Sequence, residues 1–354
     1  MTRLLAITLV LPLVVSLPAF PGESQTPVLA QSDTARVEQI ASVLGLDAPL
    51  AASWAFSGKD SSLVSLSGGA GALGYACVDN GQPGPALREV IFDSGVAGTL
   101  ETNPQSCAQR AVGTAKTLGG PKFTHDGLFS YNLCFQYLDK ATGKAEGDVA
   151  VDALTGRLSL PGGKLGAAIG VPARPPKGKS SVLPVPRYGM RMSLRATALA
   201  MLFGYWADHG FPEVGKKQTK DGLQTEAQYI EEFSRACGAC SERTATELFI
   251  TGRGMMAKIE TLRVSDEHPS KDLADKVIAE LDAGRPMFVR VTTANVNHYF
   301  IICGYVEANG TTFLVAKVPF PEGSADGWGG YYVFSLPTGF ESAEFVLVEL
   351  KAKK

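Results

Sequence analysis

The sequence predicts an α+β protein of more than one domain, with helices preceding an antiparallel sheet in its C-terminal half. Hydrophobic residues make up 45% of the 354 positions, which excludes an intrinsically disordered chain. This length corresponds to two domains of about 150 residues each. Along residues 181–354 the apolar spacing changes from the period of a helix to that of a strand, which is typical of an α+β arrangement.

The charges nearly balance, with 33 basic and 35 acidic residues and a net charge of −2. Such a balance excludes a surface that attracts polyanions over the whole chain, so we expect no nucleic-acid partner. We also expect no cofactor and no metal. After the N-terminal segment no stretch approaches the roughly 20 apolar residues that a transmembrane helix needs, so we expect no membrane span.

Residues 1–30 have the pattern of a secretory signal peptide. Arg3 precedes an apolar run over residues 4–15, prolines follow it, and a site of small residues ends at Ala30. The run is shorter than a membrane span. Secretion is therefore the predicted localisation, and an uncleaved N-terminal anchor is the alternative.

The six cysteines are predicted to lie in an oxidising compartment, where they can form disulfides of undetermined connectivity. Cys303 lies in an apolar run and is predicted to be a buried thiol. Cys237 and Cys240 form a C-x-x-C motif after a predicted helix, without the second ligand pair that zinc needs. This motif favours a structural disulfide over a redox or zinc site.

Residues 31–160 contain two segments with one pattern, a helix and then two strands. The first has a helix over 36–45 and strands over 73–77 and 89–95; the second has a helix over 110–119 and strands over 131–137 and 148–156. Residues 151–158 resemble the closing strand of PepSY domains, which implies an inhibitory or packing module that lies on the C-terminal cleft. His125 has no ligand or base at a useful spacing and is expected to be chemically isolated.

Residues 161–180 form a linker rich in Pro, Gly and Lys. No Asp or Glu occurs between Ala153 and Ala207, so the linker is basic. A solvated linker explains this composition, and docking on an anionic envelope polymer is the alternative, in which the protein is an envelope-associated structural protein.

Residues 181–354 carry the helices and strands of the C-terminal domain. Ser193 is a natural N-cap for a helix whose apolar residues share one face, and two more helices are predicted over 227–233 and 273–281. Strands are predicted over 287–291, 298–306, 311–318, 331–334 and 344–350, with a tight hairpin at Asn309–Gly310.

Four segments of this domain together resemble the bacteriocin-processing, double-glycine peptidases, the thirty-ninth family of cysteine peptidases. They are Val185–Pro186, the helix over 196–206, the run over 284–289 and the strand over 298–305, which is the most specific. The resemblance covers about residues 181–350 and implies a papain-like fold. It also implies a cysteine nucleophile at the start of the central helix, a histidine base, an orienting aspartate and an upstream glutamine for the oxyanion.

Three of these four roles are altered here. The nucleophile position holds Ser193, the base position holds His298, and the position of the orienting aspartate holds Val318; Gly189 and Met190 occupy the neighbourhood of the glutamine. We therefore expect a secreted, catalytically degenerate peptidase-like protein that binds extended peptide or protein. The alternative is an active hydrolase that uses Ser193 and His298, with an orienting group supplied by Asn297 or Asp326.

We expect the mature protein to begin near Gln31. N-terminal sequencing of protein recovered outside the cell measures this directly. Secreted protein that still begins with Met1 would contradict the signal-peptide interpretation.

Overall fold

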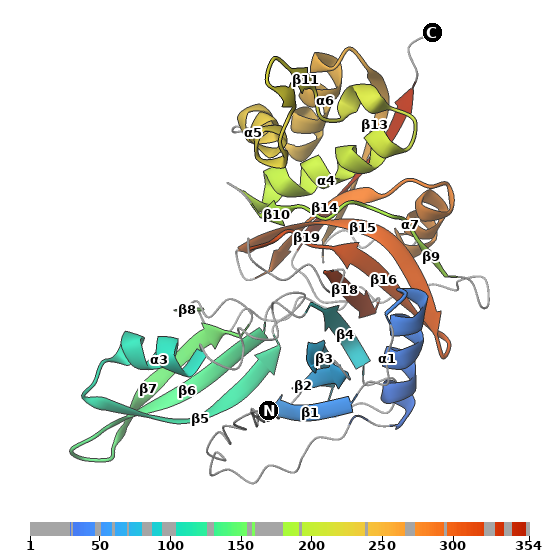
Figure 1. Cartoon of the computed structure of the whole chain (residues 1–354). Helices are drawn as coiled ribbons and strands as arrows, with labels where there is room; N and C mark the ends of the chain where they lie inside the picture. The colour runs from blue at the N-terminus through green and yellow to red at the C-terminus, as the bar shows by residue number, and fades with distance from the viewer. Residues whose placement is uncertain are drawn as a thin grey trace, which may run out of the picture.

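The protein is described here from a computed structural model of the whole chain (Figure 1). The structure describes residues 29, 31–46, 51–58, 61–68, 71–79, 87–93, 104–125, 131–153, 158–159, 180–190, 193–237, 240–265, 273–293, 296–321, 330–335 and 342–351. Most of the predicted signal peptide and of the linker lies outside these residues. Leu29 is described, and its side chain is buried in the core.

The first unit is one helix followed by an antiparallel meander. Its elements are α1 (Gln31–Val43), β1 (Ala51–Ser57), β2 (Ser61–Gly68), β3 (Gly71–Asp79) and β4 (Leu87–Phe92). Val37, Ile40 and Ala41 are buried on one side of α1, as the helical spacing predicts. The strands predicted near β3 and β4 are present, whereas β1 and β2 were not predicted.

The second unit repeats this order in a separate four-stranded sheet. It contains α3 (Pro104–Val112), β5 (Lys116–His125), β6 (Tyr131–Asp139), β7 (Ala145–Asp152) and β8 (Leu158–Ser159). The helix predicted over 110–119 was wrong in position, because residues from Lys116 onward are a strand. A helix there is disfavoured by Gly119, Gly120 and Pro121, and the prediction rested on apolar spacing without weighing these residues.

The C-terminal half begins with helices and ends with strands. Its elements are β9 (Ser181–Val182), β10 (Gly189–Met190), α4 (Leu194–Asp208), the 3₁₀ turn η1 (Pro212–Val214), β11 (Gln218–Thr219), β12 (Gly222–Leu223), α5 (Glu226–Cys237), α6 (Glu242–Gly252), β13 (Met256–Ser265), α7 (Leu273–Asp282), β14 (Met287–Thr293), β15 (Val296–Ala308), β16 (Thr311–Lys317), β17 (Phe320–Pro321), β18 (Tyr331–Ser335) and β19 (Ser342–Lys351). The three predicted helices and five predicted strands are confirmed, and α6 and β13 were not predicted. The hairpin at Asn309 and Gly310 is also confirmed, because both residues have positive φ, 48° and 77°.

One long sheet joins the first unit to the C-terminal half (Figure 1). Its strand order is β1-β2-β3-β4-β18-β16-β15-β14-β19-β13, and β9 also pairs with β15. The junction is the antiparallel pair of β4 and β18, in which Val90 lies opposite Val333 and Phe92 opposite Tyr331. Segments more than 200 residues apart in the chain thus share one ladder of hydrogen bonds.

Both faces of the long sheet are covered, which gives two apolar cores. The first core lies under α1, α4, α5 and α6, and the second lies between the sheet, α7 and the second unit. In β15 a register shift between Ile302 and Gly304 exchanges the faces, so Tyr305 enters the second core although Cys303, two residues earlier, lies in the first. A Cβ at Gly304 would lie 2.4 Å from the carbonyl oxygen of Ser181, so β9 can pair here only because residue 304 is glycine.

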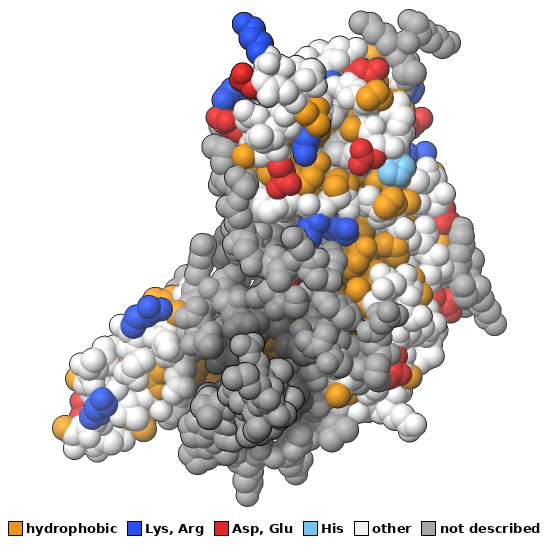
Figure 2. All heavy atoms as spheres, in the orientation of Figure 1, with side chains coloured by type: hydrophobic (Ala, Val, Ile, Leu, Met, Phe, Trp, Pro, Cys, Tyr) orange, Lys and Arg blue, Asp and Glu red, His pale blue; other side chains and the backbone are white. Residues whose placement is uncertain are grey.

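The face of the molecule in Figure 2 carries acidic and basic side chains interspersed, in keeping with the small net charge. None of the helices in the described part of the chain is long and apolar enough to cross a membrane. The predicted boundaries at residues 30, 160 and 180 stay predictions, as does the packing of the N-terminal module on a C-terminal cleft. The structure joins these parts by the pairing of β4 with β18, by the packing of α1 in the first core and by side-chain contacts such as Arg187 with Asp93 at 2.7 Å.

Because the sheet is continuous, we expect Phe92→Ala to destabilise both halves together. Phe92 is fully buried in the first core beside β18, and its truncation is expected to cost about 3–5 kcal/mol. Urea unfolding followed by far-UV circular dichroism should show one transition at a lower midpoint. Leu248→Ala, on an exposed position of α6, is the control and should change stability by less than about 0.5 kcal/mol. Two transitions of which only one moves would contradict the expectation.

Candidate functional site

Ser193, to which the sequence resemblance assigns the nucleophile position, is the N-cap of α4. Its backbone is extended (φ −149°, ψ 146°), and its Oγ accepts a hydrogen bond from the Ala196 N–H at 3.1 Å. The Ser193 carbonyl accepts the Thr197 hydroxyl at 3.0 Å. Both serine groups therefore satisfy the first turn of a helix whose next residues are almost entirely buried.

His298 lies on β15, directly opposite Val291 of β14. The strand packs against α4, so the base position and the nucleophile position belong to adjoining elements. Burial lowers the pKa of His298 to about 4. The imidazole is therefore neutral at pH 7, and it is a much weaker base than an ordinary histidine.

The two remaining positions are Val318 and the segment Gly189–Met190. Val318 follows β16 and packs against the second core. Gly189 and Met190 form β10, which pairs in parallel with β17, and the Gly189 N–H donates to Oε1 of Glu226 at 3.2 Å. Among the alternative orienting groups, Asn297 accepts the Thr292 hydroxyl through Oδ1 at 2.8 Å, and Asp326 lies outside the described residues.

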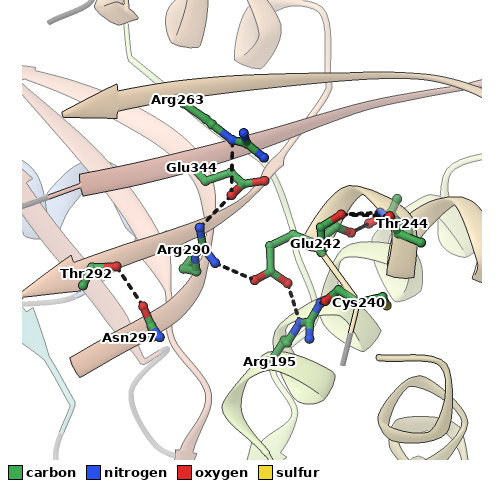
Figure 3. A network of polar contacts seen from close by, with 11 residues as sticks. Arg195, Cys240, Glu242, Thr244, Arg263, Arg290, Thr292, Asn297 and Glu344 are labelled. Atoms are coloured by element: carbon green, nitrogen blue, oxygen red, sulfur yellow. Dashed lines mark hydrogen bonds and ion pairs between the residues drawn. The ribbon is translucent and has the colours of Figure 1, made fainter. Parts of the chain in front are cut away.

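A network of buried charges lies beside the start of α4 (Figure 3). Arg195 pairs with Oε2 of Glu242, the first residue of α6, and donates to the Cys240 carbonyl at 2.8 Å. Arg290 of β14 bridges Oε1 of Glu242 at 3.3 Å and Oε2 of Glu344 at 2.8 Å. The two carboxylates are almost fully buried, 3% and 4% exposed, so the network joins α4, α6, β14 and β19 through desolvated ion pairs.

Burial dominates the electrostatics of this network. It raises the pKa of Glu242, although Arg195 and Arg290 both act to lower it. Sequence reasoning did not find these residues, because nothing in the local sequence shows that positions 195, 242, 290 and 344 meet. The ion pair of Arg195 with Glu242 joins the first turn of α4 to the first turn of α6. We infer that the network fixes the positions of these two helices.

The cysteines form no disulfide within the described part of the chain. Cys303 is fully buried, as predicted, and burial raises the pKa of its thiol to about 12. Cys237 and Cys240 were predicted to form a structural disulfide with each other or a crosslink elsewhere, and the side chain of Cys237 lies outside the described residues. Cys77 is also buried, and it belongs to a second polar cluster.

The expectation that His125 is isolated was wrong. His125 interacts with Cys77 and with the carboxylate of Glu89, and its ring stacks on that of Tyr131. Tyr332 of β18 donates to the same carboxylate. We call these five residues the junction cluster. Strand alternation places Cys77 and Glu89 on the face of the second core, but their contact with His125 depends on how two sheets pack, which local spacing does not encode.

The described residues contain no group of three or more His, Cys, Asp or Glu side chains placed to hold a metal ion.

Comparison with known proteins adds little to these observations. No family model matches the chain, and no curated protein does. Among solved structures, the chain is similar to UfSP from C. elegans with a TM-score of 0.31 and 11% sequence identity, over 55% of this chain and 40% of that one. This likeness is too weak to indicate a function. The α+β architecture rests on the secondary structure and the strand pairing of the chain itself.

Removing Arg195 should expose the importance of the buried network. We expect Arg195→Ala to destabilise the protein by about 3 kcal/mol, because the Glu242 carboxylate is left buried with less compensating charge. Arg243→Ala is the matched control. It breaks an Arg–Glu pair at i, i+4 whose side chains are both about half exposed, and such pairs contribute about 0.3–0.5 kcal/mol. Equal losses in the two variants, measured by urea unfolding, would show that the network is not a buried one in solution.

Proposed function

We propose that this protein is a secreted, catalytically degenerate relative of papain-like double-glycine peptidases, and that it acts by binding extended peptide or protein. The observation that carries this proposal is the geometry at Ser193. Its hydroxyl lies where the resemblance puts a nucleophile, yet that hydroxyl caps the helix through the Ala196 N–H. Ser193 therefore serves as the N-cap of the helix, and a hydroxyl at this position is a poor nucleophile.

The chemistry of the replacements supports the same conclusion. A cysteine at a helix N-terminus beside a histidine ionises before substrate arrives, with its pKa lowered from about 8.5 to roughly 3–4. A serine hydroxyl instead needs a histidine that takes its proton during attack, and His298 is made a weak base by burial. Loss of the orienting aspartate, as at Val318, costs about 10⁴-fold in turnover in related mechanisms.

The remaining parts of the proposal follow from the sequence. The predicted signal peptide is the ground for proposing secretion, and the tandem N-terminal module is proposed to regulate or complete the C-terminal binding surface. The pairing of β4 with β18 is compatible with this role, because it already occupies that edge of the C-terminal strands with a strand of the first unit. A peptide ligand would then bind elsewhere on the C-terminal half.

The first test is cleavage of a fluorogenic peptide that contains Gly-Gly, the class implied by the resemblance. We expect no turnover above that of the Ser193→Ala variant. Fluorescence anisotropy with an uncleavable form of the same peptide should show saturable binding, unchanged in the control Lys351→Ala, an exposed position of β19. Cleavage that disappears in Ser193→Ala would overturn the degenerate assignment, and absence of binding would overturn the binding role.

The second test restores the missing groups. Ser193→Cys alone should react slowly with iodoacetamide at pH 6, because its histidine still lacks an orienting carboxylate. The triple change Ser193→Cys, Val318→Asp and Met190→Gln should react at least about tenfold faster, since a thiolate is the reacting form. Mass spectrometry of the peptide containing residue 193 separates this reaction from that of the native cysteines. Equal rates in the two variants would show that these positions do not form a papain-like site.

A further inference from the structure

The junction cluster contains two pairs of neighbouring residues, one pair in each of two sheets, and the two pairs face each other. Cys77 on β3 and Glu89 on β4 are direct partners in the long sheet. His125 on β5 and Tyr131 on β6 are direct partners in the four-stranded sheet, with their ring centroids 5.3 Å apart. Tyr332 completes the cluster from β18, opposite Ile91.

One carboxylate oxygen holds this cluster together. Oε2 of Glu89 accepts the hydroxyl of Tyr131 and, at 2.5 Å, the hydroxyl of Tyr332. The two phenol oxygens are themselves 2.5 Å apart, and Nε2 of His125 lies 3.4 Å from the same Oε2. A single atom thus links the first unit, the second unit and the C-terminal half.

The polar groups of the cluster are buried and not fully satisfied. Glu89 is 1% exposed, and the side chain of His125 is 11% exposed. Within the described residues neither Oε1 of Glu89 nor Nε2 of His125 has a hydrogen-bond partner. A buried carboxylate in this state requires a compensating positive charge, and the imidazolium form of His125 is the cation placed beside it.

We propose that the junction cluster is a pH-dependent latch. The imidazolium of His125 helps to hold the second unit against the long sheet at Glu89, and loss of its proton weakens that attachment. The proton comes from and returns to solvent, so no other reactant is needed.

The acid–base properties of the cluster agree with this arrangement. Burial alone would lower the pKa of His125, but a hydrogen bond to the Cys77 sulfur and the negative charge of Glu89 raise it well above the usual value. A raised pKa in the closed state means that the stabilisation is complete below about pH 6.5 and is lost as the pH rises through the closed-state value. The latch is therefore closed in acid and weakens toward alkaline pH.

Of the other titratable groups that face His125, the Cys77 thiol and the Tyr131 hydroxyl keep their protons at neutral pH. Burial raises the pKa of the Cys77 thiol, and burial together with Glu89 raises the pKa of Tyr131 well above its usual value. Tyr332 donates its hydroxyl proton to Glu89. Asp79 lies beyond Cys77 and is paired with Arg88 at 2.6 Å. Between pH 6 and 8 the change in proton binding on opening therefore belongs to His125.

Hydrogen–deuterium exchange of the full chain tests the proposal, with rates corrected for the intrinsic pH dependence of exchange. From pH 6.5 to 8 the opening constant of β5 and β6 should rise by up to about tenfold per pH unit, the limit for one linked proton. Strand β19, in the long sheet, serves as the internal reference and should keep its protection. His125→Gln should abolish the pH dependence of β5 and β6, whereas the control His209→Gln, at the end of α4, should leave it unchanged.

A second variant covers the case in which His125→Gln does not fold. Glu89→Gln removes the anion that raises the pKa of His125, so the pH dependence of β5 and β6 should disappear while their protection at pH 8 stays at or below that of the wild type. A flat wild-type profile, a pH dependence shared equally by β19, or a pH dependence that survives either cluster variant would overturn the latch.

Discussion

The pairing of β4 with β18 is the interaction on which the rest of the structure depends. It turns the strands of the first unit and those of the C-terminal half into one sheet, and that sheet must then bury both of its faces. The apolar runs of β15 and β16 follow from this requirement. A strand that is buried on both faces has no solvent-exposed positions, so polar residues do not alternate with apolar ones. The register shift near Gly304 shows the same constraint, because it exchanges faces without exposing either neighbour.

Burial on both faces also decides where charge is tolerated. Two of the buried carboxylates lie where separate elements converge, Glu242 between helices and sheet and Glu89 between two sheets. Such groups are expensive to desolvate and contribute little net stability, but breaking them is costly. They therefore favour one mutual placement of the elements over others, and Glu89 differs from Glu242 in having a titratable histidine as its cation in place of arginines.

The sequence predicted the elements better than their contacts. Helix α4 and the hairpin at Asn309 were predictable because capping, periodicity and turn chemistry are local. Strand β13 was missed because its residues are mostly half-exposed and its polar residues hide the strand pattern, and the second helix was misplaced because apolar spacing outweighed two glycines. The same contrast between local and tertiary features holds for the candidate site. Ser193 could be located as an N-cap from the local sequence, whereas the neighbours of Arg195 and His125 are set by tertiary packing alone.

The proposed function implies that a fold of this kind can lose one chemistry at positions 193 and 318 and keep its architecture. The N-cap of α4 needs only an acceptor oxygen, so serine satisfies the helix at position 193 without supplying a thiolate. The position after β16 needs only a side chain that fits the second core, so valine satisfies the packing at position 318 without supplying a carboxylate. Under the proposed function, each replacement keeps the structural part of a residue's role and removes the catalytic part. Because folding constrains only the structural part of each role, loss of the catalytic part would require no change elsewhere in the sheet or helices. Titratable groups remain at the junction of the two sheets, at Glu89 and His125.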